Sequence, residues 1–259
     1  MTTSRVATCQ FEPSLGETAT NIESIAKLAR GLPETVEFAV FPELCVTGYD
    51  LTDVSTAATP VPGPITDRLS TVARDSGVAL VVGLPEADGN SVYNSLVYVD
   101  EHGVVATYRK RRLWGAEADH FEVGTGPVTV ETPVGTLGLL LCYDLNFPEL
   151  ALEYGREDCD LLAVSAAWRQ SFERDWRLLC RARALDGPCY VVGSNHVGTQ
   201  AGRRHAGESC IAGPRGDIVA KTTDGNGVAS ATVSLRTLSE ARRKNPVRES
   251  REQTRVRPE

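Results

Sequence analysis

The stretch Thr136-Leu-Gly-Leu-Leu-Leu-Cys142-Tyr-Asp-Leu-Asn-Phe-Pro148-Glu149 joins an apolar run to a proline through a cysteine. The run 136–142 is typical of a strand that is buried on both faces. Pro148 favours the first turn of a helix. A thiol at a strand-to-helix turn lies near unpaired N–H groups and the positive end of a helix dipole, which favour its thiolate. Cys142 is therefore a candidate nucleophile, with the Tyr143 N–H as a candidate oxyanion donor. The plainer alternative is an inert buried cysteine.

The rest of the chain alternates between strand-like and helical runs. Apolar residues recur at helical spacing in 18–32, 65–76 and 172–185, and Pro148 opens a fourth helix over 148–157. Residues 92–108 are typical of a β-hairpin with its turn at 100–103. This alternation predicts a layered α/β sandwich of mixed strands in one domain over 1–259. The predicted strands span 5–11, 36–41, 78–84, 93–99, 104–109, 128–131, 136–142, 161–166, 189–195, 207–212 and 227–235.

Composition excludes several classes of protein. Hydrophobic residues make up 41% of the 259 residues, which is enough for a sizeable core, so disorder over most of the chain is excluded. The net charge of −7 lacks the basic footprint that nucleic-acid binding needs. The basic residues near the C-terminus are interleaved with glutamates. We therefore expect 236–259 to be a solvated tail involved in subunit contact.

The cysteines and apolar runs indicate where the protein works. Seven cysteines, an odd number with no C-x-x-C spacing, are typical of a reducing compartment. No apolar segment precedes the first strand, and the longest apolar runs, 78–84 and 137–142, are too short to cross a bilayer. We therefore expect a cytoplasmic protein with no membrane partner. The sequence has no H-E-x-x-H motif and no phosphate loop, so we expect no metal and no cofactor.

A catalytic thiol needs a base to activate it. Glu43 directly follows the apolar run 36–41, where a charge is costly unless it is paired or working. Lys110 follows the predicted strand 104–109. Each of these two residues, taken alone, also fits an ordinary loop position. Histidine is the usual partner of a thiol, but none has a context that singles it out among His102, His120, His196 and His205.

Taken together, three segments resemble the nitrilase superfamily of carbon–nitrogen hydrolases. The family carries a glutamate in a strand-end Pro-Glu motif, then a lysine in Tyr-x-Lys-x-x-Leu, then a cysteine followed by an aromatic and an acidic residue. Here these read Phe41-Pro-Glu43-Leu, Tyr108-Arg-Lys110-Arg-Arg-Leu113 and Cys142-Tyr-Asp-Leu-Asn-Phe-Pro-Glu149. The resemblance covers almost the whole chain. It implies a four-layer αββα sandwich with mixed sheets that pairs into homodimers through a helical face.

The resemblance also implies a role for each motif residue. Cys142 is the nucleophile, Glu43 the proton shuttle and Lys110 the oxyanion stabiliser. Glu117 matches a further family glutamate that lies near the lysine. The candidate substrate-binding residues are Tyr49, Trp114, Tyr143 and Trp168 as pocket lining, with Arg169 and His196 to recognise a carboxylate, as an ω-amidase would need.

The implied reaction is hydrolysis of a small carboxamide to a carboxylate and ammonia through a thioester. Cys142-Tyr143-Asp144 is typical of amidase branches, whereas nitrilases usually carry Cys-Trp-Glu. A nitrilase and an N-carbamoyl amino acid amidohydrolase are the alternatives within the family. Arg112 and Asn146 depart from the residues most common there, His and Arg, and bear on the subfamily. No G-x-S-x-G motif supports a serine hydrolase, and the intact triad argues against a non-catalytic interaction protein.

Overall fold

Two six-stranded mixed sheets pack face to face in the computed structural model, which describes residues 4–248 and 250. In the first sheet β1, β2 and β3 are parallel and the other pairs are antiparallel. Its order is β14 (Gly227–Thr232), β1 (Arg5–Gln10), β2 (Val36–Val40), β3 (Ala79–Asp88), β4 (Ser91–Asp100) and β5 (Gly103–Arg109).

The second sheet repeats this plan. Its strands β7, β8 and β9 are parallel, and its remaining pairs are antiparallel. Its order is β13 (Ile218–Lys221), β12 (Cys210–Ala212), β9 (Tyr190–Asn195), β8 (Leu161–Ala166), β7 (Gly135–Leu141) and β6 (Thr129–Thr132).

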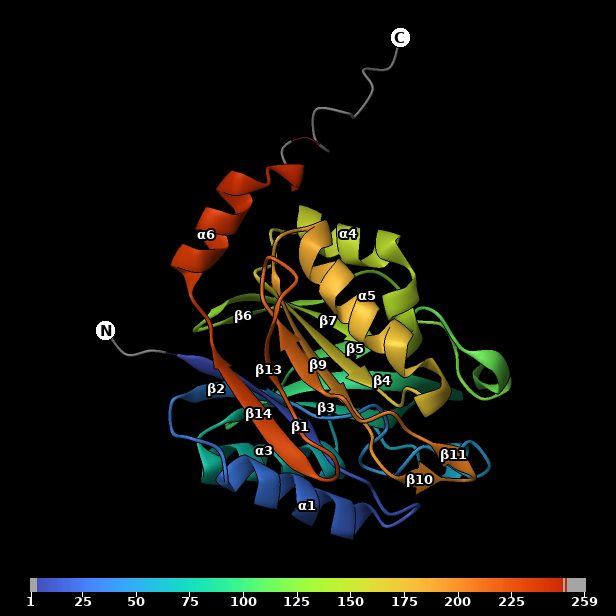
Figure 1. Cartoon of the computed structure of the whole chain (residues 1–259). Helices are drawn as coiled ribbons and strands as arrows, with labels where there is room; N and C mark the ends of the chain where they lie inside the picture. The colour runs from blue at the N-terminus through green and yellow to red at the C-terminus, as the bar shows by residue number, and fades with distance from the viewer. Residues whose placement is uncertain (1–3, 249, 251–259) are drawn as a thin grey trace.

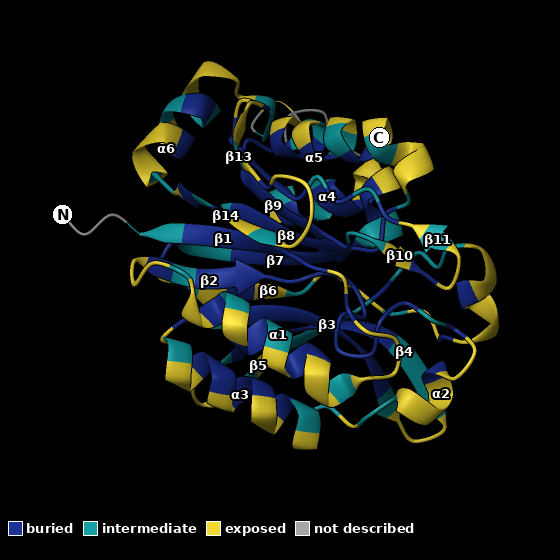
Figure 2. Ribbon diagram, turned by 60° about the horizontal axis from the view of Figure 1, so that its bottom comes forward, coloured by how far each residue is buried: buried dark blue, intermediate teal, exposed yellow. Residues whose placement is uncertain are grey.

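Two pairs of helices cover the outer faces, so the predicted four-layer αββα sandwich is confirmed (Figure 1). Helices α1 (Thr18–Arg30) and α3 (Pro64–Ser76) lie on the first sheet, and α4 (Pro148–Arg156) and α5 (Glu173–Asp186) lie on the second. Helices α1 and α3 turn an apolar stripe inward and mostly polar residues outward (Figure 2). None of the described helices is long and apolar enough to cross a membrane.

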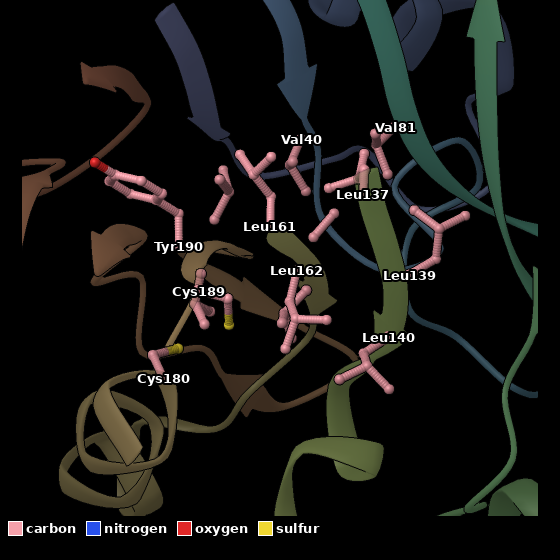
Figure 3. Packing of buried hydrophobic residues seen from close by; sticks show 14 of the residues in the cluster. Val40, Val81, Leu137, Leu139, Leu140, Leu161, Leu162, Cys180, Cys189 and Tyr190 are labelled. Carbon is pink, nitrogen blue, oxygen red and sulfur yellow. The ribbon is translucent and has the colours of Figure 1, made fainter. Parts of the chain in front are cut away.

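The central strands β7 and β8 are almost wholly apolar because both of their faces are buried. Leu137 and Leu161 of the second sheet face Val40 and Val81 of the first, as Figure 3 shows. The intervening residues of β7 point the other way: a side chain at Gly138 would meet the ring of Tyr154 in α4. The alternation of period two in β7 thus fills two separate layers of core.

Buried hydroxyl groups also join the two sheets. Ser165 Oγ in β8 donates to the carbonyl of Phe41, at 2.6 Å, just after β2. Thr8 Oγ1 in β1 donates to the carbonyl of Gly193 in β9, at 2.9 Å. These bonds satisfy polar groups at an otherwise dry interface and fix how the strand ends of one sheet lie over those of the other.

The main differences from the sequence-based expectation lie near the C-terminus. Residues 235–244, which we expected to be strand end and tail, form helix α6 (Leu235–Lys244), with Leu238 and Ala241 buried. Ser234 caps this helix by accepting a hydrogen bond from the Thr237 N–H at 3.2 Å. Residues 251–259 of the expected tail lie outside the described residues.

Several short elements were not expected. The expected strand 207–212 is reduced to β12, and the exposed strand β13 follows it. The unexpected elements are too short for a periodic pattern to reveal them. They are α2 (Val54–Ala57), the 3₁₀ helices η1 (Gly115–Asp119), η2 (Cys142–Asn146) and η3 (Gln170–Phe172), and the hairpin of β10 (Thr199–Gln200) with β11 (Arg203–Arg204).

Candidate active site

Cys142 sits at a sharp turn between β7 and η2. Its φ is 43°, in the left-handed region that residues other than glycine seldom adopt. Leu141 before it is still extended, so the chain reverses direction at the cysteine itself. Backbone strain of this kind persists only where the surroundings enforce it, and it clusters at functional sites. Cys142 is also the one partly exposed cysteine, since the other six are buried.

Lys110 follows β5 and is 1% exposed. Its N–H donates to the carbonyl of Asn94 at 2.9 Å, which extends the β4–β5 pairing to the lysine itself. Its ammonium group donates to Glu43 Oε1 at 2.6 Å and to Glu117 Oε1 at 2.8 Å. One buried cation therefore bridges two carboxylates that come from distant parts of the chain.

The Glu43 carboxylate is fully buried and held from three sides. Besides Lys110, the side-chain amide of Asn94 donates to Oε1 at 2.8 Å. The Ala167 N–H, at the end of β8, donates to Oε2 at 3.0 Å. The same N–H reaches the Cys142 thiol and acts to lower its pKa. Ala167 thus places the carboxylate and the sulfur side by side.

Glu117 is the second carboxylate and lies in η1. Its Oε1 accepts from Tyr49 Oη at 2.7 Å as well as from Lys110, and its Oε2 accepts from the Trp114 N–H at 2.7 Å. With these three donors, both oxygens of the buried carboxylate have hydrogen-bond partners. Glu117 is 0% exposed and does not line the cavity itself, but its partners Lys110, Tyr49 and Trp114 do.

The electrostatics of this cluster favour a neutral thiol beside a charged lysine. Burial, and then the charge of Glu43, raise the pKa of Cys142 well above its usual value, against the opposing effect of Lys110. Burial alone would lower the pKa of Lys110, but the Glu117 and Glu43 carboxylates outweigh it and raise that pKa. The thiol must therefore lose its proton to a neighbour before it can attack.

A cavity of about 180 Å³ opens on Cys142 and Lys110. Five of the six predicted substrate-binding residues line it, and five further lining residues were not predicted from the sequence. The predicted lining residues are Tyr49, Trp114, Tyr143, Trp168 and Arg169, and the additional ones are Asn146, Ala167, Phe172, Asp175 and Arg203.

His196, the sixth predicted residue, lies behind Glu43 and not in the cavity lining. Its Nε2 bonds to the carbonyl of Glu43, so the ring supports the main chain of that residue. The ring of His205 lies 5.0 Å away, between centroids. Burial lowers the pKa of His196 to about 4. Burial and the nearby charges of His196, Arg203 and Arg169 lower the pKa of His205 to about 3.

Replacement of His205 by phenylalanine tests this electrostatic environment. An unfolded histidine binds a proton near pH 6.5, but folded His205 does so only near pH 3, so the free energy of unfolding falls as the pH drops through this window. His205→Phe should lose less stability than the wild type between pH 8 and pH 4.5 in urea unfolding. His102→Phe, on the exposed turn after β4, is the control and should follow the wild type. An identical pH dependence in all three proteins would contradict the prediction.

Known proteins resemble this chain in sequence and in fold. The carbon-nitrogen hydrolase family model matches residues 5–243. A probable nitrilase of Schizosaccharomyces pombe is 31% identical over 240 residues, which cover 89% of this chain and 88% of that protein. The 2-oxoglutaramate amidase of Bacillus subtilis is 28% identical over 246 residues, covering 93% and 95%.

A solved structure adds a similar fold with a modified cysteine. It is a mutant of the amidase from Nesterenkonia sp. AN1, with the acetamide moiety of fluoroacetamide added covalently at the active-site cysteine. It aligns with a TM-score of 0.84 and 25% identity, covering 96% of this chain and 97% of that one. With the family match over nearly its whole length, the chain belongs to the carbon–nitrogen hydrolase family and is a hydrolase of carbon–nitrogen bonds.

Proposed function

We propose that the enzyme hydrolyses a small carboxamide to a carboxylate and ammonia through a thioester on Cys142. One observation carries the proposal. The Lys110 ammonium group is bonded to both Glu43 and Glu117 and shares a cavity with the Cys142 thiol. A proton acceptor, an oxyanion donor and a nucleophile thus surround one reacting carbon, as acyl transfer requires.

In the first half of the reaction Glu43 accepts the proton of Cys142 as the sulfur attacks the amide carbonyl carbon. The raised pKa of the thiol makes this transfer part of the attack. The Lys110 ammonium group and the Tyr143 N–H stabilise the tetrahedral oxyanion. Donors of this kind are each worth about 3–4 kcal/mol in the transition state. Glu117 keeps Lys110 charged and in place.

In the second half the protonated Glu43 returns its proton to the departing nitrogen. The carbon–nitrogen bond breaks, ammonia leaves and the acyl group stays on sulfur as a thioester. Glu43 then takes a proton from water, whose oxygen attacks the thioester carbon. The carbon–sulfur bond breaks, the proton returns to sulfur and the carboxylic acid leaves, then ionises to the carboxylate as its proton passes to ammonia in solution. The two halves balance with water as the one added reactant.

The choice of an amide over a nitrile rests on Cys142-Tyr143-Asp144 and on amidase relatives. The Bacillus subtilis protein is a 2-oxoglutaramate amidase and the Nesterenkonia protein is an amidase. The Schizosaccharomyces pombe relative is a probable nitrilase, so nitrile hydrolysis is the second candidate. An N-carbamoyl amino acid, whose carbamoyl group also ends in an amide, is the third. We also infer a cytoplasmic location, because all seven thiols are free.

Variants of the thiol and its base test the proposed chemistry. The wild type should release ammonia from amides faster than from matched nitriles or N-carbamoyl amino acids. Cys142→Ala should abolish the activity, and Glu43→Gln should lower kcat by about 10²–10⁴-fold because it cannot move the proton. Iodoacetamide should label Cys142 and spare the six buried cysteines. Cys159→Ala, whose thiol lies outside the cavity, is the control. Full activity in Cys142→Ala would refute the mechanism.

Two arginines at the cavity indicate an anionic substrate. Arg169 stacks on Trp114, with 4.2 Å from guanidinium carbon to ring centre, and Arg203 lies 5.4 Å from the ring of Tyr49. Neither has an ion-pair partner within residues 4–248. The charge of Arg203 acts on nearby Asp50, and Asp175 lines the same cavity, but neither carboxylate forms an ion pair with these arginines. Stacked, partly exposed guanidinium groups that are not ion-paired suit a substrate carboxylate. We therefore propose an ω-amide with a carboxylate at its far end, which is also how 2-oxoglutaramate is built.

Charge removal at Arg203 tests this substrate class. Arg203→Met should raise KM for succinamate by roughly tenfold or more, since a charged hydrogen bond contributes about 1.5–3 kcal/mol. Butyramide has a similar size without the carboxylate, and its kinetics should change little. Arg203→Lys, which keeps the charge but loses the planar fork, should be intermediate. Equal losses for both substrates would indicate that Arg203 supports the cavity and does not recognise charge.

We also propose a homodimer that pairs through the outer face of α5 and β13. Leu178 and Leu185 lie seven residues apart on α5 and are 62% and 44% exposed. Val219 in β13 is also 44% exposed, and the turn at Gly216 lies against Leu185. Apolar side chains gathered on one face are typical of a surface that a partner covers. A second copy, related by two-fold symmetry, would bury this face on both chains.

A single charge on this face should separate the subunits. Leu178→Glu places a carboxylate in the proposed interface, where burial without a partner is costly. Sedimentation equilibrium should give twice the chain mass for the wild type and the chain mass for Leu178→Glu. Val105→Glu, at an exposed apolar residue of β5, is the matched control and should stay dimeric. A wild type that sediments as a monomer would end the proposal.

A further inference from the structure

Asp144 is a third buried carboxylate close to Lys110 and Cys142, and it has no role in the proposed mechanism. We propose that Asp144 is a positioning residue that holds Lys110 at a fixed distance from Cys142. The inference rests on the proposed function, because it concerns the geometry of that thiol and that oxyanion donor. Asp144 is 0% exposed and lies outside the cavity lining, so it acts through its neighbours.

The hydrogen bonds of Asp144 flank Lys110 on both sides. Its Oδ2 accepts from Tyr108 Oη at 2.7 Å, and its Oδ1 accepts from the Arg112 N–H at 2.8 Å. These donors stand two residues before and two residues after the lysine. A rigid carboxylate between them fixes the chain segment from which the ammonium group projects.

The same carboxylate is tied to the nucleophile. Asp144 stands two residues after Cys142, and its Oδ2 also accepts from the Leu141 N–H at 3.1 Å, immediately before the cysteine. This bond closes the turn in which Cys142 adopts its φ of 43°. Tyr108 belongs to β5 of the first sheet and Leu141 to β7 of the second. Asp144 therefore links the lysine of one sheet to the cysteine turn of the other through three hydrogen bonds.

Loss of the Asp144 hydrogen bonds should change the position of Lys110 but not its charge. The Nζ atom of Lys110 is already held by Glu43 and Glu117, so the lysine would stay charged and buried without Asp144. Its distance to the carbon attacked by Cys142 would no longer be fixed. A misplacement of about 1 Å can cost roughly 10²-fold in rate. The loss should fall on the step in which an oxyanion develops and spare steps in which none does.

Asp144→Asn tests the inference. Asparagine keeps the size of the side chain, but its NH₂ group cannot accept from all three donors. At pH 8, above the pKa of about 6 to which burial raises this carboxyl, kcat for amide hydrolysis should fall by about 10²-fold with little change in KM. Alkylation of Cys142 by iodoacetamide, which forms no oxyanion, should fall far less. A general structural defect would slow both reactions alike.

Two tyrosine variants keep the test decisive if Asp144→Asn folds poorly. Tyr108→Phe removes one of the three bonds and should lower kcat by about two- to tenfold, again without matching loss of alkylation. Tyr154→Phe is the matched control, because the hydrogen bonds of this buried hydroxyl go to the main chain of Leu139 and Val128 and not to Asp144. An active wild type with unchanged kcat in both Asp144→Asn and Tyr108→Phe would overturn the inference. A wild type inactive on all amides would instead overturn the proposed function.

Discussion

The Lys110 ammonium group between two buried carboxylates is the interaction on which the rest of the structure depends. Each of the three charges alone would be costly in this interior, and the cation offsets that cost for both anions at 2.6 and 2.8 Å. Its partners come from the end of β2 and from η1, while the lysine follows β5. The strand order of the first sheet must therefore bring these segments to one edge. A fold with another strand order would bury these charges without partners. The ion cluster therefore forms only in this sheet topology, and it stabilises that topology in turn.

The cluster also explains why a thiol can rest here without being a thiolate. Two carboxylates and only one ammonium group surround Cys142, and burial adds to the penalty for a further anion there. The pKa of the thiol is raised for both reasons. This differs from our sequence-based reasoning, in which a helix N-terminus favours the thiolate. Cys142 begins the short 3₁₀ helix η2 and precedes α4 by several residues, so its nearest strong influences are Glu43 and Lys110.

The sequence predicts the parts of this site that depend on local pattern. Glu43, Lys110 and Cys142 each lie at or just after the end of a predicted strand, which makes each a candidate, but only the resemblance to a known family joins the three into one site. Arg203 could not be found in this way, because it lies on a hairpin of two-residue strands with no periodic signal. Asn94 acts through a side-chain amide inside a strand, and Ala167 acts through its main-chain N–H. The directions of both groups depend on the register of strands across the sheets, which the sequence does not reveal. Helix α6, in contrast, could have been predicted from the sequence. Ser234 is a typical helix cap, and Leu235, Leu238 and Ala241 have helical spacing.

The position of Glu43 shows why the site belongs to the packing between the sheets and to neither sheet alone. Its main chain continues from β2 of the first sheet, but its carbonyl bonds to His196, after β9, and its Oε2 accepts from Ala167, after β8. Ser165 in β8 bonds to the carbonyl of Phe41 just before it. The second sheet, which carries Cys142, thus holds the glutamate at two points and the residue Phe41 at a third, and the first sheet supplies Lys110. Any shift of one sheet over the other would alter all the distances at the reacting carbon together. The apolar layer between the sheets therefore helps to keep the catalytic distances fixed, since close-packed interiors resist such a shift.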